Sequence, residues 1–385
     1  MPKITFLVSA LLFAFILAAQ HTIQFGIKSL PANHPSGAAV YLAGSLNGWN
    51  PQNEQYRFQK DESGSYFLNL KLPSGSYEYK ITRGGWDNVE CQKTGVGISN
   101  RLLKVDADIT VELNIEEWQD RFPVKPRDHT AGKNVQVIDT AFHIPQLQRV
   151  RRVWIYLPED YKTSKTRYPV LYMHDGQNVF DDATSYSGEW GVDECIDSMK
   201  NKCIVVAVDN GGLKRLNEYC PYDFSLTGIA AGYNSNKGEG NLYVDFLVGS
   251  LKPYIDKNYR TLENRKNTFI AGSSMGGLIS LYAILKYPRV FGGAGVFSPA
   301  FWVGPKIFDD INTKGKKVKG KIWFYAGKQE SDAMVPDILK AFDEMSAVSK
   351  SKMITVIRDD GKHNESRWRI EFPAFYYWLM YPGSH

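Results

Sequence analysis

A serine stands at the centre of a five-residue motif that is typical of catalytic nucleophiles. The motif is Gly272-Ser273-Ser274-Met275-Gly276, a G-x-S-x-G placed between an apolar strand-like stretch and a segment with helical spacing. A strand that turns abruptly into a helix strains the central backbone, and the flanking glycines let the chain pack closely there. The hydroxyl then lies at a helix N-terminus, which favours developing negative charge. We predict that Ser274 is a nucleophile.

A serine hydroxyl is a weak nucleophile until a base accepts its proton, and two later loops offer the partners. His363 lies in a polar loop between a strand expected at Met353–Ile357 and the final helix, so we predict that it is the base. Glu330 and Asp332 both follow a strand expected at Ile322–Tyr325, where the acid belongs in this chain order. We favour Glu330 as the carboxylate that orients the imidazole, and Asp332 stays open.

Two backbone N–H groups are expected to bind the oxyanion that forms during attack. One is the N–H of Met275, directly after the nucleophile, and the other is that of Gln177 in the loop Met173–Asn178. Gly176 allows a tight approach in this loop. His174 comes before the serine in the chain, so we expect it to fix the loop rather than to act as the base.

The length of 385 residues exceeds what one hydrophobic core usually organises, so two domains are expected. A composition of 43% hydrophobic and 23% charged residues excludes the disordered and fibrous classes. Short strands with turn residues between them fill 21–119 and predict an all-β, immunoglobulin-like antiparallel sandwich. The polar, proline-containing stretch 120–132 is a linker. Strands that alternate with helices in 133–385 predict an α/β domain with a mostly parallel sheet.

The hydrophobic pattern predicts where the individual strands and helices lie. The expected strands are 39–43, 76–81 and 109–113 in the first domain, and 150–157, 169–173, 204–208, 268–271, 294–297, 322–325 and 353–357 in the second. Helical spacing is found at 243–254 and 278–287.

The N-terminus has the pattern of a secretory signal peptide. Lys3 precedes an apolar run from Ile4 to Ala19, with small residues at its end. We predict a signal peptide over 1–20 and a secreted or periplasmic protein, with no membrane contact beyond that segment. An uncleaved anchor is the alternative, although the run is short for a spanning helix.

Charge and cysteine usage suggest neither nucleic acid nor metal as a partner. The net charge is +5, and the five lysines of 314–321 lack arginine and aromatic neighbours, so a solvated loop is expected there. Among Cys91, Cys195, Cys203 and Cys220, the second and third could pair, and buried free thiols are the alternative. No Cys/His ligand pattern is present, and no metal or cofactor is expected.

From 135 to 381 the chain resembles the esterase family that includes esterase D, enterochelin esterases, and feruloyl and acetyl-xylan esterases. The matching blocks are 174–178, 272–277, 327–330 and 361–368, in the family's order. The resemblance implies an α/β-hydrolase fold, the triad Ser274, Glu330 and His363, and an oxyanion hole at Gln177 and Met275. It also implies pocket-lining positions at Trp190, Arg215 and Glu218, with a packing role for Trp190 equally open.

The N-terminal stretch is similar to starch- and glycogen-binding modules. The similarity lies in 40–51, 75–81, 85–90 and 100–101. It implies that Trp49 and Trp86 stack on sugar rings, because a flat aromatic face suits the apolar face of a sugar. A core position for either tryptophan is the alternative.

Together these features predict a serine carboxylic ester hydrolase that works through an acyl-enzyme and removes acetyl or feruloyl-type esters from carbohydrate. A siderophore esterase, an acyl transferase to sugar and a non-catalytic glycan-binding surface protein are the alternatives.

Overall fold

A computed structural model describes residues 20–122, 126–226 and 236–381. The described chain divides into two compact units, one formed mainly by 20–122 and the other by 126–225 and 236–381. The predicted signal segment lies outside the described residues except for Gln20, which is the first residue of strand β1.

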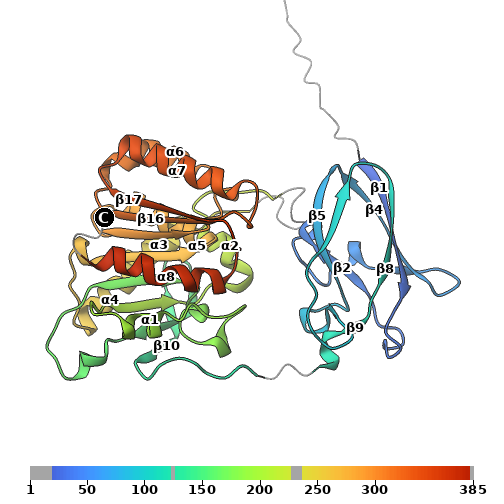
Figure 1. Ribbon diagram of the computed structural model, residues 1–385, viewed down its shortest axis with the longest axis horizontal. Coiled ribbons are helices and arrows are strands. Elements are labelled where there is room, and N and C mark those ends of the chain that lie inside the picture. Colours follow the sequence, from blue (N-terminus) through green and yellow to red (C-terminus); the bar gives the residue numbers. More distant parts are fainter. Residues whose placement is uncertain (1–19, 123–125, 227–235, 382–385) are drawn as a thin grey trace, which may run out of the picture. The chain divides into compact units, whose positions relative to one another are not determined.

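The N-terminal unit consists of strands in two main sheets (Figure 1). One sheet has the order β3-β4-β1-β8 and the other β2-β5-β7, while β6 and β9 form a separate pair. The strands are β1 (Gln20–Ser29), β2 (Tyr41–Gly44), β3 (Gln59–Lys60), β4 (Tyr66–Pro73), β5 (Gly75–Thr82), β6 (Glu90–Cys91), β7 (Arg101–Val105), β8 (Ile109–Asn114) and β9 (Glu117–Trp118). The expected β-fold is confirmed, but the purely antiparallel arrangement is wrong because β1 pairs parallel with β8.

Side chains of both sheets fill the core of this unit. In β5, Tyr77, Tyr79 and Ile81 are buried at every second position, as a strand with one face on a core requires. They pack with Ile23, Phe25 and other buried residues of the first sheet.

The C-terminal unit is built on one large sheet. Within the described residues its order is β10-β11-β13-β12-β14-β15-β16-β17. The strands are β10 (Val135–Ile144), β11 (Arg149–Tyr156), β12 (Val170–His174), β13 (Ile204–Val208), β14 (Thr268–Ser273), β15 (Gly293–Phe297), β16 (Lys321–Gly327) and β17 (Lys352–Arg358). Only the pairings of β11 are antiparallel among these, so the predicted mostly parallel sheet is confirmed.

Helices cover both faces of this sheet (Figure 1). They are α1 (Val192–Ser198), α2 (Arg215–Tyr219), α3 (Gly240–Phe246), α4 (Lys252–Asn258), α5 (Met275–Lys286), α6 (Ile307–Lys314), α7 (Met334–Val348) and α8 (Glu365–Met380). A π-helical turn, Leu247–Leu251, joins α3 to α4, so the helix expected at 243–254 is interrupted. With helices on both faces, the central strands are buried along their whole length, as in β13.

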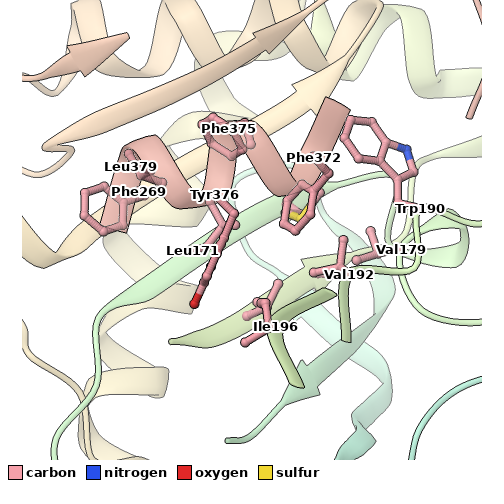
Figure 2. Close-up of a cluster of buried hydrophobic side chains, with 14 of the residues drawn as sticks. Leu171, Val179, Trp190, Val192, Ile196, Phe269, Phe372, Phe375, Tyr376 and Leu379 are labelled. Atoms are coloured by element: carbon pink, nitrogen blue, oxygen red, sulfur yellow. The ribbon is translucent and has the colours of Figure 1, made fainter. Parts of the chain in front are cut away.

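Helix α8 lies on the sheet across a closely packed aromatic core (Figure 2). Phe372, Phe375, Tyr376 and Leu379 of this helix are all buried there. A Cβ added to Gly295 in β15 would lie 2.7 Å from the Phe375 ring, so glycine is what lets the helix approach. The position of α8 matters for function because its first turn follows directly after His363.

The structure also tests the predictions for the lysine-rich run and for the cysteines. The stretch 314–321 is a solvated loop only in part, because Lys314 ends α6 and Lys321 is the half-buried first residue of β16. All four cysteines lie in the described ranges and are free thiols, so Cys195 and Cys203 do not pair.

Among the described helices, none combines the length and apolar character needed to cross a bilayer.

Candidate active site

Ser274 occupies a strained turn between β14 and α5. Its backbone has φ 58° and ψ −119°, a conformation that non-glycine residues rarely adopt. The turn is held because the Ser274 N–H donates to the Phe297 carbonyl at 2.9 Å, while the Ser274 carbonyl accepts from Ala300 N–H at 3.0 Å. A Cβ on Gly272 would lie 2.9 Å from the His174 ring and 3.0 Å from the Gly276 carbonyl carbon. The motif glycine is therefore required by close packing.

His363 and Glu330 come together from two loops that follow β17 and β16. The imidazole Nδ1 lies 2.7 Å from Glu330 Oε2. The Glu330 side chain is 1% exposed and that of His363 is 39% exposed. Glu330 Oε1 also accepts from the Gly327 N–H at 2.7 Å. Asp332 is exposed. Of the two acids that the sequence left open, the structure brings Glu330 to the histidine.

A buried hydroxyl and an indole extend this pair into a network. Ser298 Oγ donates to Glu330 Oε1 at 2.7 Å, and Trp368 Nε1 donates to Ser298 Oγ at 2.9 Å. The His363 ring lies edge-on to Trp368, with ring centroids 5.1 Å apart. A carboxylate with this many donors is fixed in one orientation, and it fixes the imidazole in turn.

Ser274 and His363 line the same cavity, which has a volume of about 910 Å³. Most of the residues that line it are of polar types, and Tyr186 and Trp368 are the hydrophobic side chains among the described residues that line it. Tyr186 is 89% exposed at this wall. The remaining lining residues are Arg152, Asp175, Gln177, Asn178, Thr184, Ser185, Ser187, Asp209, Asn210, Gly212, Arg215, Ser273, Asn364 and Glu365.

The two predicted oxyanion donors lie at starts of helical turns. Met275 is the first residue of α5, where N–H groups have no carbonyl partner within the helix. Gln177 lies in the 3-10 turn Gly176–Asn178 after β12, and it lines the cavity. A Cβ on Gly176 would lie 2.8 Å from the Val208 carbonyl carbon, so this loop depends on glycine to approach β13.

In the N-terminal unit, Trp49 and Trp86 lie beside each other. Their ring centroids are 6.1 Å apart with an interplanar angle of 42°. Trp86 is 43% exposed and Trp49 is half-buried. Neither belongs to the core of this unit, whose fully buried tryptophan is Trp118. Asn47 holds the loop of Trp49 by accepting from Gly44 N–H at 2.8 Å and donating to the Leu42 carbonyl at 2.7 Å.

Two known families match parts of the chain. Residues 144–378 match the model of the Esterase family, described as Putative esterase. The chain belongs to the Esterase family. Residues 36–119 match the pullulanase X25 domain, a carbohydrate-binding-like module. The predicted family resemblance is thereby confirmed.

Relatives of this Esterase-family chain match parts of it. It is 29% identical over 277 residues to an endo-1,4-β-xylanase/feruloyl esterase from Xylanibacter ruminicola, covering 66% of this chain and 36% of that protein. It is 40% identical over 95 residues to an α-amylase from Niallia circulans, covering 24% of this chain and 7% of that protein. The chain therefore spans well under two thirds of the length of these curated relatives.

Solved structures share the fold. The enterobactin esterase FES from Shigella flexneri has a TM-score of 0.53 at 16% identity, covering 94% of this chain and 93% of that one. The BES protein from Bacillus cereus has a TM-score of 0.54 at 17% identity, covering 67% of this chain and 99% of that one. These likenesses confirm the α/β-hydrolase fold.

In this Esterase-family chain, His174 lies beneath the nucleophile turn. It is buried, its Nδ1 lies 3.0 Å from the Tyr243 hydroxyl, and its ring contacts the positions of Gly272 and Gly276. Burial lowers the pKa of His174 to about 4. The ring is neutral at physiological pH and braces the turn, in keeping with the expected positioning role.

Arg215 lines the cavity, as the family resemblance implied, and it forms an ion pair with Asp175 that the sequence did not reveal. Arg215 donates from Nε and Nη2 to the two carboxylate oxygens of Asp175 at 2.7 and 2.8 Å, and Asn210 Nδ2 donates at 2.7 Å. Burial opposes ionisation of Asp175, but Arg215 and Asn210 outweigh it and lower its pKa. Glu218 does not line the cavity, because it is buried against Arg149 and Arg151.

Glu365 is a further cavity residue that sequence reasoning missed. It is buried at the start of α8, and its Oε1 accepts from Asn178 Nδ2 at 3.1 Å. Burial raises the pKa of Glu365. The bond joins the loop of Gln177 to the loop of His363. Its position two residues after the histidine was the available signal.

Trp190 was expected to line the pocket or to pack, and the structure decides for packing. Its side chain is 4% exposed, and Figure 2 shows it above Val179 near Phe372. The ring stacks on Trp368 with centroids 5.8 Å apart and meets Phe297 edge-on at 5.0 Å. A substrate-binding role for Trp190 is thus wrong. It supports Trp368, which does line the cavity.

Proposed function

We propose that this protein is a serine carboxylic ester hydrolase that acts through an acyl-enzyme on esters of carbohydrate. The observation that carries the proposal is the Glu330–His363 bond in a cavity that also exposes Ser274 at a strained strand-to-helix turn. Acyl transfer requires an exposed nucleophile, an oriented base and N–H groups that bind the oxyanion. The strained turn at Ser274, the imidazole and the N–H groups at the helix starts provide these.

In the proposed reaction His363 accepts the Ser274 proton while the hydroxyl oxygen attacks the ester carbonyl. The oxyanion is bound by the N–H groups of Met275 and Gln177. The intermediate collapses with loss of the alcohol, which takes the proton back from His363, and leaves the acyl group on Ser274. Water then gives up a proton to His363, attacks the acyl-enzyme and releases the carboxylic acid. Glu330 stays ionised and stabilises the imidazolium at each step.

The polarity of the cavity favours a polar substrate. Half of the residues that line it have charged or amide side chains, which suits sugar hydroxyl groups better than a long aliphatic chain. Trp368 and the exposed Tyr186 offer flat faces for a sugar ring or an aromatic acyl group. The X25-like module and the similarity to a xylanase/feruloyl esterase support acetyl or feruloyl esters of a polysaccharide.

The test is hydrolysis of p-nitrophenyl acetate, methyl ferulate and acetylated xylan by the full chain and by Ser274→Ala. We expect a loss of at least about 10⁴-fold in turnover for Ser274→Ala. The matched control Ser273→Ala removes the neighbouring hydroxyl and should retain most activity. Hydrolysis of enterobactin in preference to all three substrates would favour the siderophore alternative. A folded chain that hydrolyses none of the four would contradict the proposal.

We further propose that Trp49 and Trp86 bind a neutral glycan. Their adjacent rings and the exposure of Trp86 give a stacking surface on a loop fixed by Asn47. Trp86→Ala should weaken binding to soluble starch or xylan by about 2- to 10-fold, the value of one lost stacking contact. Trp302→Ala, at an exposed position of the other unit outside the catalytic cavity, is the control. Unchanged binding in Trp86→Ala would leave these tryptophans without a binding role.

We also propose that the protein is exported, on the signal-like pattern of 1–20.

A further inference from the structure

A second cavity, of about 460 Å³, lies at the opposite edge of the large sheet from Ser274. Six basic side chains are among the described residues that line it: Arg265, Lys266, Lys319, Lys321, Lys350 and Lys352. The described part of its wall contains no Asp or Glu. We call it the basic cavity.

The sheet itself brings these residues together. The stretches 265–267, 319–321 and 350–352 lead into β14, β16 and β17, which run parallel and are linked through β15. Parallel strands place their amino ends at one edge, so chain segments far apart in sequence meet there. The same strands carry the catalytic loops at their carboxyl ends. The two cavities are therefore separated by about 20 Å, the length of a six-residue strand.

Among the described residues, no carboxylate compensates the charges in the basic cavity. Within the part of the chain that the structure describes, none of its six basic side chains forms an ion pair with a carboxylate. Arg265 donates to the Lys319 backbone carbonyl at 2.6 Å, and Lys321 donates to the carbonyls of Trp378 and Leu379 at 2.7 and 3.1 Å. Burial, and then the nearby charge of Lys352, lower the pKa of Lys321. Like charges held this close repel one another and attract an anion.

The wall also has an apolar part. Phe269 and Leu379 line the cavity as largely buried core side chains, and the half-buried ring of Tyr381, which also lines it, stacks on Tyr377 with centroids 4.2 Å apart. An aromatic ring beside ammonium groups suits a sugar ring that carries an acidic group, because the C–H face of the sugar packs on the aromatic ring and the anion pairs with an ammonium group.

We propose that the basic cavity binds the anionic group of an acidic glycan, a carboxylate or a sulfate borne on a sugar. Its concave form suits one compact group. A nucleic-acid site has a long basic groove with aromatic side chains for successive bases, which this cavity does not offer. The proposal is independent of ester hydrolysis.

The test is isothermal titration calorimetry of the full chain with tetragalacturonate and with a sulfated heparin tetrasaccharide, at low and at physiological salt. Maltotetraose serves as the neutral probe and single-stranded DNA as the unrelated polyanion. Lys350→Gln/Lys352→Gln removes two charges from the cavity. The control pair is Lys316→Gln/Lys317→Gln. It removes two exposed charges that do not line the cavity, from the lysine-rich run 314–321 that also contributes Lys319 and Lys321 to the lining.

We expect one of the acidic tetrasaccharides to bind, with an affinity that falls as salt rises. The carboxylated and sulfated probes distinguish the two sources of charge. Lys350→Gln/Lys352→Gln should weaken binding by about tenfold, the effect of losing one charge-assisted hydrogen bond, and the control pair by less than about twofold. Equal losses in the two pairs, DNA binding as tight as glycan binding, or no binding of either acidic probe would overturn the proposal. Unchanged ester hydrolysis and maltotetraose binding in both pairs would separate this site from the other two.

Discussion

The two edges of the large sheet carry charged side chains in opposite arrangements. At the carboxyl edge three pairs of an acidic and a basic side chain lie at the cavity: Glu330 bonds His363, Arg215 bonds Asp175, and Arg152 bonds Asp209 at 2.8 Å. At the amino edge of the same strands, the cations of the basic cavity have no carboxylate partner in the described structure.

This difference separates two uses of charge. Paired charges with several hydrogen bonds hold side chains in one geometry, which proton transfer and oxyanion binding require. Unpaired charges of one sign produce an attractive field but do not fix a geometry, which suits the capture of an anion. In the two proposals, the strands β14, β16 and β17 serve both purposes because a parallel sheet has two chemically independent edges.

The largest expected effect comes from breaking a pair at the carboxyl edge. Glu330→Gln should lower kcat by about 10³- to 10⁴-fold with little change in KM, because the imidazolium loses its carboxylate. The measurement is the steady-state hydrolysis of p-nitrophenyl acetate. Asp332→Asn removes a charge of the same sign two residues away and should change kcat by less than about twofold. Equal losses in the two variants would mean that pairing at this edge is not what positions the base.

An effect of intermediate size is expected on stability, from His174, the neutral histidine beneath Ser274. Because burial lowers the pKa of His174 to about 4 in the folded chain, unfolding allows it to take up a proton below the ordinary pKa of 6.5. The contribution of neutral His174 to the free energy of unfolding is therefore complete above about pH 6.5. It is lost as pH falls toward 4, which lowers the free energy of unfolding by up to about 3 kcal/mol.

The free energy of unfolding in urea, measured from pH 7 to pH 5, tests this dependence. His174→Asn keeps a polar atom near the Tyr243 hydroxyl and should flatten the dependence on pH. The control His143→Asn, at an exposed position of β10, should not. If the free energy of unfolding falls equally with pH in the wild type and in both variants, His174 does not set the acid sensitivity.

The smallest effect is expected at the amino edge, where removing charge should stabilise the fold. Lys350→Gln/Lys352→Gln should raise the free energy of unfolding by about 0.5 kcal/mol at low salt, since repulsion between exposed charges is weak, and by nothing measurable at high salt. Urea denaturation at both salt concentrations measures this. Lys316→Gln/Lys317→Gln is again the reference. A loss of stability in the cavity pair at low salt would mean that these cations are compensated.

Much of the fold and site was predictable from local pattern. The strand expected at 204–208 is β13, and those at 268–271 and 294–297 fall within β14 and β15, because continuous apolar runs bounded by polar residues are a local signal. The G-x-S-x-G motif located the turn at Ser274 for the same reason. Strands β1 and β10 were missed, since their residues are largely half-buried or exposed and lack that contrast.

Other features depend on contacts between distant residues. Ser298 joins Glu330 to Trp368 across about seventy positions, and no spacing rule connects the three. The family resemblance implied a pocket-lining position for Trp190, and only the packing of α8 shows that it is buried.

The sequence by itself predicted the two-part organisation, the G-x-S-x-G motif at Ser274, and the order in which the proposed acid and base follow it along the chain. These follow from composition and from the near-neighbour geometry of strands and helices. The tertiary structure decided between Glu330 and Asp332, placed Trp190 in the core, and gathered six cations at one edge of the sheet. Burial and charge pairing depend on which distant segments meet, and that is fixed by the register of the sheet and not by any local pattern.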